Sequence, residues 1–181
     1  MHLLAAATMF TSMTLVASHG RLMDPPARNS MWRLGFNNPV NYNDNELYCG
    51  GRVTQWARNK GKCGVCGDPY HNVIKDHEVG GKYANGIISR EYTQGGTIEI
   101  IVHITANHKG YFEFRICPVE DPKVEVTQEC LDTHLMTLAG GEGSRFFLPE
   151  GKSNQFFNVS VKLPEDVTCK QCVVQWKYRT G

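Results

Sequence analysis

The segment TIEIIVHIT, residues 97–105, decides the fold class. Aliphatic residues occupy alternate positions along it, namely Ile98, Ile100, Val102 and Ile104. Successive side chains of a β-strand point to opposite faces, so these residues share one face. The pattern predicts a strand that buries one face in a core and turns the other towards solvent.

Further segments along the chain repeat this alternation. Residues 111–117, YFEFRIC, follow the turn-forming tetrapeptide NHKG, and we expect them to pair with the first strand as a hairpin. Residues 156–163 and 172–178 are also predicted strands, and parity places Tyr178 on the inward face of the second.

Glycine and proline separate these strands, because the 181 residues include 18 Gly and 8 Pro. We expect a single all-β domain, an antiparallel sandwich of the immunoglobulin or fibronectin III type with long loops and short helices. Residues 19–48 are expected to wrap the surface as loops. Residues 49–86 are expected to form an excursion pinned by disulfides, with a short helix over residues 53–59.

The charge balance excludes several classes of partner. The formal net charge is +1 at pH 7, and no run of basic residues is present. Such a chain has no electrostatic surface for nucleic acid or anionic lipid, so we expect neither partner. After the first residues no segment is long and apolar enough to span a membrane. The protein is expected to be a monomer.

The N-terminus indicates secretion. Residues 3–16 are apolar or small and uncharged, and Val16, Ala17 and Ser18 place small residues at a cleavage position. This pattern predicts a signal peptide over residues 1–18 and an extracellular protein. A buried N-terminal helix is the alternative.

The cysteine content agrees with secretion, because secreted domains use disulfides where cytosolic proteins keep thiols reduced. The disulfide candidates are Cys49, Cys63, Cys66, Cys117, Cys130, Cys169 and Cys172. Their odd number leaves one thiol over, and we expect the natural chain to continue past residue 181 and to supply its partner. Cys117 and Cys130 are placed to close a loop between two strands, but the sequence does not fix the connectivity.

Cleavage before His19 would create a metal-binding group. The free α-amino nitrogen and Nδ1 of the same residue can chelate one metal ion without backbone strain, and a second imidazole would add a third nitrogen. Copper accepts amine and imidazole ligands in planar arrangements. The alternative is that His19 is an ordinary solvated residue.

The chain from His19 onward resembles a known family. The run HGRLMDPPAR, residues 19–28, is similar to the start of lytic polysaccharide monooxygenases of the animal-type group, auxiliary-activity family fifteen. The same group is resembled, in the same order, by NP at 38–39, CGG at 49–51, CGVCGD at 63–68, HKGYFEF at 108–114, SRFFLP at 144–149 and CVVQWKY at 172–178.

The resemblance implies a copper centre in a catalytic domain that spans residues 19–181. His19 would supply its amino nitrogen and Nδ1, and His108 the third nitrogen, to one copper ion. Tyr178 would lie in the axial position, and Ala106 near the opposite axial side, as in chitin-active relatives. The family's C-terminal loop is absent from this sequence.

The resemblance also implies the reaction and the partner. A secreted enzyme of this family uses an external reductant with hydrogen peroxide or dioxygen to cleave glycosidic bonds oxidatively. Its partner would be a crystalline polysaccharide, chitin or also cellulose, bound on a flat face made by loops. Whether oxidation falls at C1 or C4 stays open.

The sequence leaves other functions open as alternatives to this one, but it gives no support for a hydrolase. A hydrolase needs two carboxylates that flank the scissile bond, and the acidic residues show no such pairing motif. A non-catalytic chitin-binding module with the same fold is the main alternative. A zinc-stabilised intracellular domain is another, on the spacing of Cys63, Cys66, His71 and His77.

Three remaining positions are expected to have simpler roles. His103 and His134 are expected to be structural histidines. Asn158 begins the triplet NVS and is a candidate for N-glycosylation, with its side chain on the outward face of its strand.

Overall fold

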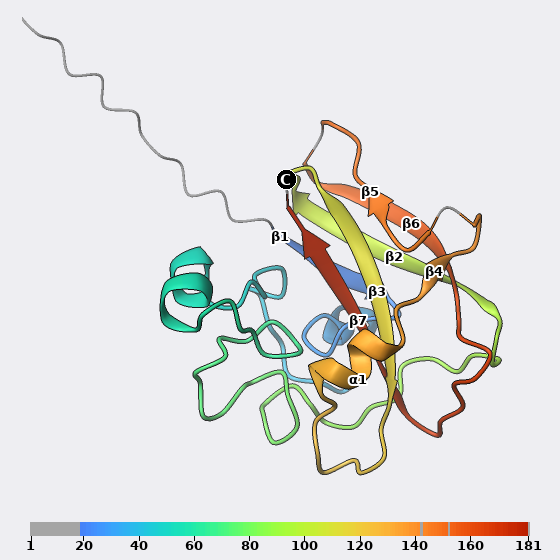
Figure 1. The fold of residues 1–181 in the computed structure, drawn as a ribbon. Helices are drawn as coiled ribbons and strands as arrows, with labels where there is room; N and C mark the ends of the chain where they lie inside the picture. Colours follow the sequence, from blue (N-terminus) through green and yellow to red (C-terminus); the bar gives the residue numbers. More distant parts are fainter. Residues whose placement is uncertain (1–18, 142, 152, 181) are drawn as a thin grey trace, which may run out of the picture.

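Two antiparallel sheets face each other in the computed structural model, which describes residues 19–141, 143–151 and 153–180 (Figure 1). The four-stranded sheet has the order β1-β2-β6-β4. Its strands are β1 (His19–Asp24), β2 (Thr97–Ala106), β6 (Gln155–Lys162) and β4 (Thr137–Leu138). The three-stranded sheet has the order β5-β3-β7. Its strands are β5 (Phe146–Phe147), β3 (Tyr111–Pro118) and β7 (Cys172–Arg179).

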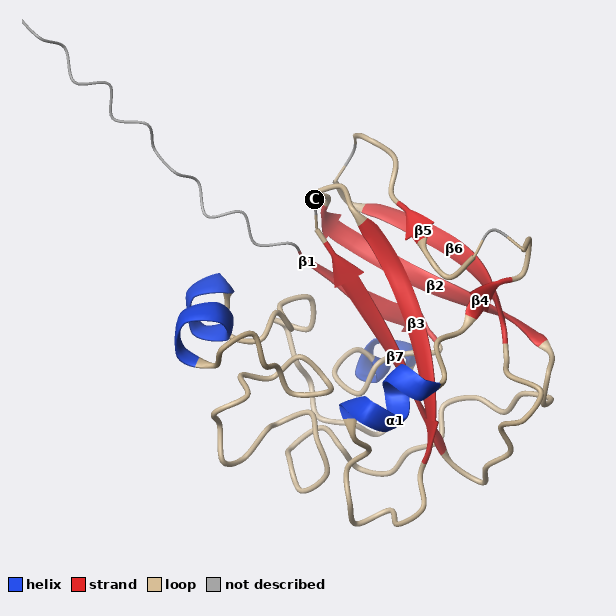
Figure 2. Cartoon of the chain, in the orientation of Figure 1, coloured by secondary structure: helices blue, strands red, loops and turns tan. Residues whose placement is uncertain are grey.

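Helices are few and short in the described chain (Figure 2). They are the 3₁₀-helix η1 (Met31–Leu34), the π-helix η2 (Val53–Arg58) and the α-helix α1 (Gln128–Thr133). The helix expected over residues 53–59 is therefore present as η2. The expectation of an all-β sandwich with long loops and short helices is confirmed.

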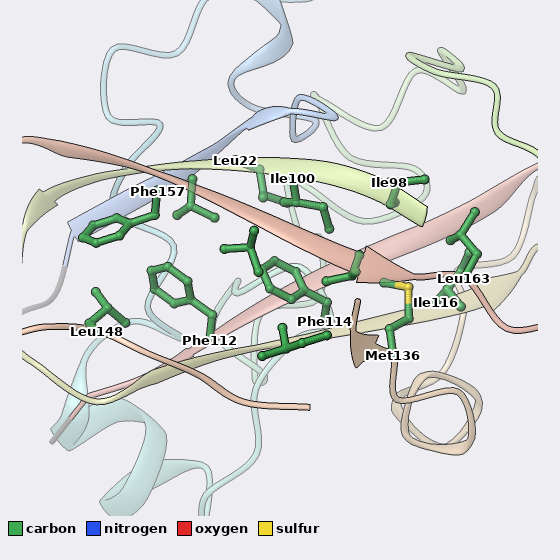
Figure 3. Packing of buried hydrophobic residues seen from close by; sticks show 14 of the residues in the cluster. Leu22, Ile98, Ile100, Phe112, Phe114, Ile116, Met136, Leu148, Phe157 and Leu163 are labelled. Carbon is green, nitrogen blue, oxygen red and sulfur yellow. The ribbon is translucent and has the colours of Figure 1, made fainter. Parts of the chain in front are cut away.

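The core lies between the sheets and contains the residues that the alternation places inward (Figure 3). Ile100, Val102 and Ile104 of β2 are fully buried, as are Phe112 and Phe114 of β3. Each such side chain contributes about 1.5–3 kcal/mol relative to an exposed position. The period-two pattern of the sequence thus identified the layer that holds the two sheets together.

The expected hairpin between β2 and β3 is wrong. These consecutive strands belong to different sheets, and β2 pairs with β1 and β6 while β3 pairs with β5 and β7. The reason is that both strands have a fully apolar face. Packed face to face they bury both faces at once, whereas pairing edge to edge would leave that burial to other elements.

The N-terminal stretch also differs from expectation, because it was expected to be loop throughout. Residues His19–Asp24 form the edge strand β1, with Leu22 buried in the core. Edge strands tolerate the irregular pairing seen here, with register shifts after His19 and Leu22. The regular pairing with β2 ends at Asp24, before Pro25 and Pro26, and beyond it Pro26 forms only an isolated bridge with Met23. The rest of the stretch is loop and η1.

Disulfides fix the loops, as expected for this chain. The pairs are Cys49–Cys63, Cys117–Cys130 and Cys169–Cys172. The first pins the excursion after residue 48. The second joins β3 to α1, not two strands as expected. Cys66 has no disulfide partner among the described residues.

The expected signal peptide, residues 1–18, lies outside the described residues, as does Glu142. Within the described part of the chain, no helix has the length and apolar character needed to cross a membrane.

Candidate metal centre

The pairing of β1 with β2 brings the two candidate histidines to one end of the sandwich. His19, at the start of β1, lies opposite Ala106, at the end of β2. His108 follows two residues later in the connection to β3. Figure 1 shows the beginning of β1 beside the end of β2. The strand register, not proximity in sequence, therefore brings His19 close to the segment that carries His108.

Tyr178 reaches the same end from the other sheet. Tyr178 of β7 pairs with Phe112 of β3. Its phenol oxygen accepts a hydrogen bond from the backbone N–H of His108 at 3.0 Å. The ring makes an edge contact with Phe112, with centroids 5.2 Å apart, and stacks against Trp176 at 6.2 Å. Burial raises the pKa of Tyr178 above its ordinary value, although the hydrogen bond from His108 opposes this, so the phenol is neutral at neutral pH.

The turn that carries His108 is held by its neighbours. Asn107 Oδ1 accepts the backbone N–H of Lys109 at 2.9 Å, and Asn107 Nδ2 donates to the carbonyl of Pro149 at 3.2 Å. Gly110 has φ +87°, and a Cβ there would lie 1.9 Å from the carbonyl oxygen of Arg179. Only glycine therefore lets the turn approach the end of β7 this closely.

A loop beside β1 presents a carboxylate and a ring to His19. Glu46 Oε1 lies 3.6 Å from His19 Nε2, and the Tyr48 ring makes an edge contact with the imidazole at 6.2 Å. The carbonyl of Asn45 accepts the N–H of Gly20 at 3.0 Å. No motif in the sequence marks Asn45, Glu46 or Tyr48 as part of a site. The contact joins distant parts of the chain, and Glu46 carries no motif that would have indicated it.

The donor set fits copper. Among the described residues no group of three or more His, Cys, Asp or Glu side chains is arranged to hold a metal ion. A metal at His19 and His108 would therefore need a third donor from the main chain, and a free amino group at His19 would supply it. Two imidazoles and one amine form an all-nitrogen set that suits copper.

Two cavities of the described chain are lined by residues other than those at the histidine end of the sandwich. One cavity, of about 180 Å³, is lined by loop residues from Val73 to Gly80. The other, of about 140 Å³, lies beside Leu163, Val167 and Cys172 at the end of β6. Neither cavity is lined by His19, His108 or Tyr178.

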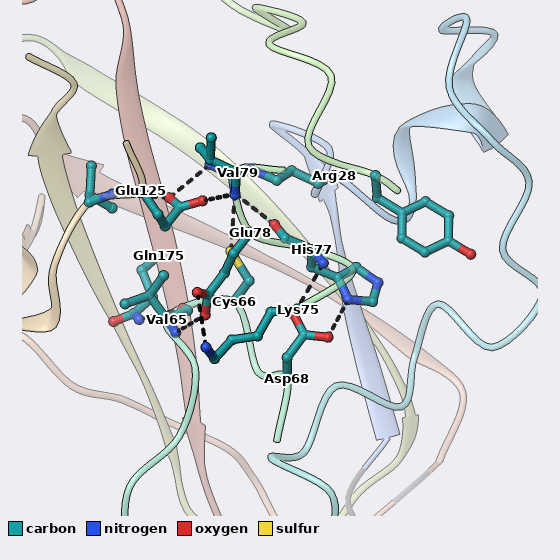
Figure 4. Close-up of polar contacts among 12 residues, drawn as sticks. Arg28, Val65, Cys66, Asp68, Lys75, His77, Glu78, Val79, Glu125 and Gln175 are labelled. Carbon is teal, nitrogen blue, oxygen red and sulfur yellow. Dashed lines mark hydrogen bonds and ion pairs between the residues drawn. The ribbon is translucent and has the colours of Figure 1, made fainter. Parts of the chain in front are cut away.

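The zinc alternative does not fit the structure. Cys63 is consumed by its disulfide with Cys49. His77 Nδ1 lies 3.0 Å from Asp68 Oδ1, and its ring stacks on Tyr83. The thiol of Cys66 instead accepts a hydrogen bond from Arg28, within a cluster of ion pairs and hydrogen bonds (Figure 4). These side chains have structural partners and do not converge on a common point.

Glu113 is also held by neighbouring side chains. It lies in ion pairs with Arg115 at 2.9 Å and Arg145 at 3.1 Å. Burial raises the pKa of Glu113, but the hydrogen bonds and charges of both arginines outweigh burial and hold it below its ordinary value. A carboxylate that resists protonation is a poor general acid, which argues against hydrolysis here.

His103 and Asn158 lie on the outer face of the four-stranded sheet. The ring of His103 stacks on Phe156 with centroids 4.3 Å apart, and its Nε2 lies 2.8 Å from Asn154 Oδ1. Asn158 of β6 is exposed. His103 therefore has the structural partners expected of it.

Comparisons with known proteins give a consistent result. A family model described as lytic polysaccharide mono-oxygenase, cellulose-degrading, matches residues 19–181. The solved structure of the lytic polysaccharide monooxygenase AA15 from Thermobia domestica in the Cu(I) state is 50% identical in sequence. It superposes with a TM-score of 0.86 and covers 90% of this chain and 84% of its own. No curated protein matches the chain.

Proposed function

Because the chain belongs to the lytic polysaccharide monooxygenases, copper-dependent enzymes that cleave polysaccharides oxidatively, we propose that His19 and His108 hold its copper and that chitin is its substrate. The observation that carries the proposal is the register that sets His19 opposite Ala106, two residues before His108. In this arrangement one ion can bind both imidazoles and the amino group of a chain that begins at His19.

Processing before His19 is the first part of the proposal. The match to the family model begins at this residue, and the apolar residues before it have the composition of a signal peptide. The disulfides support an oxidising compartment, and therefore secretion. Asn158, exposed on β6, is the proposed glycosylation site, and the mature protein is proposed to be a monomer.

The side chains around the site have defined tasks. Bound copper would supply the redox chemistry, with an external reductant and with hydrogen peroxide or dioxygen as co-substrate. Tyr178 holds the peptide of His108 through its phenol oxygen. Gly110 lets the turn approach β7, and Ala106, which pairs with His19 and lies two residues before His108, has only a methyl side chain. Together Tyr178 and Gly110 position the turn that carries His108.

The substrate is proposed to be chitin because Ala106 corresponds to a small residue of chitin-active relatives. The description of the matching family model names cellulose, so cellulose is the necessary comparison. A crystalline chain cannot enter a deep pocket, so the proposal requires His19 and His108 to be accessible on an extended surface.

The test uses protein that begins at His19, loaded with copper, with ascorbate and hydrogen peroxide. Incubation with β-chitin should release oxidised oligosaccharides that mass spectrometry identifies, with little product from cellulose. Equal or greater yield from cellulose would overturn the substrate assignment. Binding to chitin without oxidised products from a copper-loaded sample would support the non-catalytic binding module.

A further inference from the structure

The Nε2 atom of His19 faces an acidic side chain. Glu46 Oε1 lies 3.6 Å from it, beyond a good hydrogen bond but within ion-pair distance. The two side chains are 26% and 43% exposed, so the pair lies at the surface of the site without being fully solvated. The proposed copper ligand of the same ring is Nδ1, which leaves Nε2 free to interact with Glu46.

The loop that presents Glu46 is firmly anchored. The preceding Asp44 is 1% exposed and forms ion pairs with Arg21 of β1 and Arg33 of η1. Its carbonyl oxygen also accepts a hydrogen bond from Asn29 Nδ2 at 2.8 Å. A buried carboxylate with two guanidinium partners resists displacement, because breaking the pairs would leave a buried charge.

A second anchor lies directly at the metal end. Asn45 accepts the N–H of Gly20 with its carbonyl oxygen and donates from Nδ2 to Thr105 Oγ1 at 2.8 Å. It therefore bridges β1 and β2 beside His19 and Ala106. With Asp44 and Asn45 both fixed, the backbone of Glu46 has a defined position relative to His19.

Resting on the proposed function, we propose that Glu46 is a positioning residue for the imidazole of His19. The carboxylate attracts the Nε2–H group, fixes the ring orientation with Nδ1 towards the metal, and raises the basicity of Nδ1. Carboxylate partners of metal-bound histidines commonly act in this way, and their loss costs about 10–100-fold in metal affinity or activity. The added negative charge also favours Cu(II) over Cu(I).

The test compares Glu46→Ala and Glu46→Gln in protein that begins at His19. Glu129→Ala is the matched control, since it removes an exposed carboxylate from α1, an element that packs against β3. Copper(II) affinity by competition titration and the Cu(II)/Cu(I) midpoint potential are the measurements. Thermal unfolding of each variant checks that the fold is intact.

The Ala variant should bind Cu(II) about tenfold more weakly, at the lower end of the range because the pair is partly exposed. If Cu(I) affinity is unchanged, the potential rises by about 59 mV. The Gln variant should lie between Ala and wild type because it keeps an acceptor oxygen but loses the charge. Glu129→Ala should match wild type in both measurements.

Values for both Glu46 variants equal to those of the Glu129 control would overturn the role of Glu46. Failure of the proposed function gives a different result, because wild-type protein would then bind copper no better than His108→Ala. Tight wild-type binding, loss in His108→Ala and no change in Glu46→Ala would reject this inference alone.

Discussion

The phenol oxygen of Tyr178 accepts a hydrogen bond from the backbone N–H of His108 at 3.0 Å. This bond links the end of β7 to the connection between β2 and β3, and so joins the two sheets at the proposed metal centre. Tyr178 thus acts on His108 through the peptide, whether or not a metal is bound. Its contribution to the site can be measured in the apo protein.

Replacing Tyr178 with Phe should keep copper binding but lower stability. The ring can keep its contacts with Phe112 and Trp176, while the half-buried N–H of His108 loses its acceptor. The free energy of unfolding should fall by about 1 kcal/mol, measured by denaturant titration of the apo protein. The electron paramagnetic resonance spectrum of the copper form should also change.

Tyr42→Phe is the control, because Tyr42 is 81% exposed and its hydroxyl is available to water. It should change neither stability nor spectrum. If Tyr178→Phe behaves like this control, the hydroxyl has no role in holding His108 and Tyr178 is only a core aromatic.

Replacing His108 with Ala should remove a copper ligand without unfolding the protein. The remaining amino group and imidazole of His19 form only a bidentate site, so copper affinity should fall by orders of magnitude and oxidative cleavage should stop. The measurement is copper titration by calorimetry, followed by product analysis.

His103→Ala is the matched control for this change. His103 lies on the outer face of β2, stacked on Phe156, and takes no part in the proposed site. The copper affinity of the His103→Ala variant should equal that of wild type. Equal losses in both variants would show that the His108 effect is not ligand removal.

The N-terminal amino group gives a separate prediction with a pH dependence. Copper must displace a proton from this group, whose ordinary pKa is about 7.7–8.0, so affinity should rise with pH until the group is deprotonated. Protein that begins at Ser18 should lack this chelate and bind copper far more weakly. Similar affinity and spectra for the two forms would contradict a chelate at His19.

The sequence determined the buried faces better than the strand partners. Alternation is a local property, so Ile100, Val102, Phe112 and Phe114 were assigned inward correctly. Whether β2 lies beside β3 or across from it depends on how two apolar faces are covered, which is a property of the whole chain. The short turn before β3 allows β3 either to pair with β2 or to cross to the opposite sheet. The prediction of a hairpin between β2 and β3 was wrong because the turn does not distinguish these two arrangements.

The residues of the proposed site also differ in whether the sequence could indicate them. His19, His108 and Tyr178 were proposed from motifs and lie at one end of the sandwich. Glu46 was not proposed, because its place beside His19 depends on the path of a loop. That path is fixed by the buried Asp44 and its arginine partners, and no sequence pattern marks an acidic loop residue as buried.

Gly110→Ala should disturb the His108 turn more than its backbone conformation alone would predict. The residue has φ +87°, and a Cβ would lie 1.9 Å from the carbonyl oxygen of Arg179, which is backbone and cannot move aside cheaply. The matched control is Gly80→Ala, which has the same φ of +87° but no atom within 4 Å of a Cβ.

Both substitutions place a side chain in the left-handed region, at a cost of about 1–2 kcal/mol. Only Gly110→Ala adds the clash, so its unfolding free energy should fall further than that of Gly80→Ala, and copper binding should weaken with it. Equal losses in denaturant titrations would mean that the turn can move away from β7 without consequence.

Cys66 should be unreactive in the folded protein at neutral and mildly alkaline pH. Part of the residue is accessible, but burial of the thiol raises its pKa to about 12, against the smaller opposing effect of Arg28. The thiolate is the nucleophile, so very little reactive form exists below pH 9. Labelling with Ellman's reagent at pH 8 should be slow in native protein and rapid in guanidinium chloride, where the thiol has its ordinary pKa.

The same shift makes stability depend on pH in the alkaline range. The pKa of Cys66 is higher in the folded state than its ordinary value of 9.0, so the unfolded chain loses this proton first. The stabilising contribution is therefore complete below pH 9 and is lost as the pH rises towards about 12. Cys66→Ala removes this titration, and its unfolding free energy should fall less between pH 8 and pH 10 than that of wild type. Parallel decreases in the two proteins, or rapid labelling of native wild type at pH 8, would show that the thiol is not buried in this way.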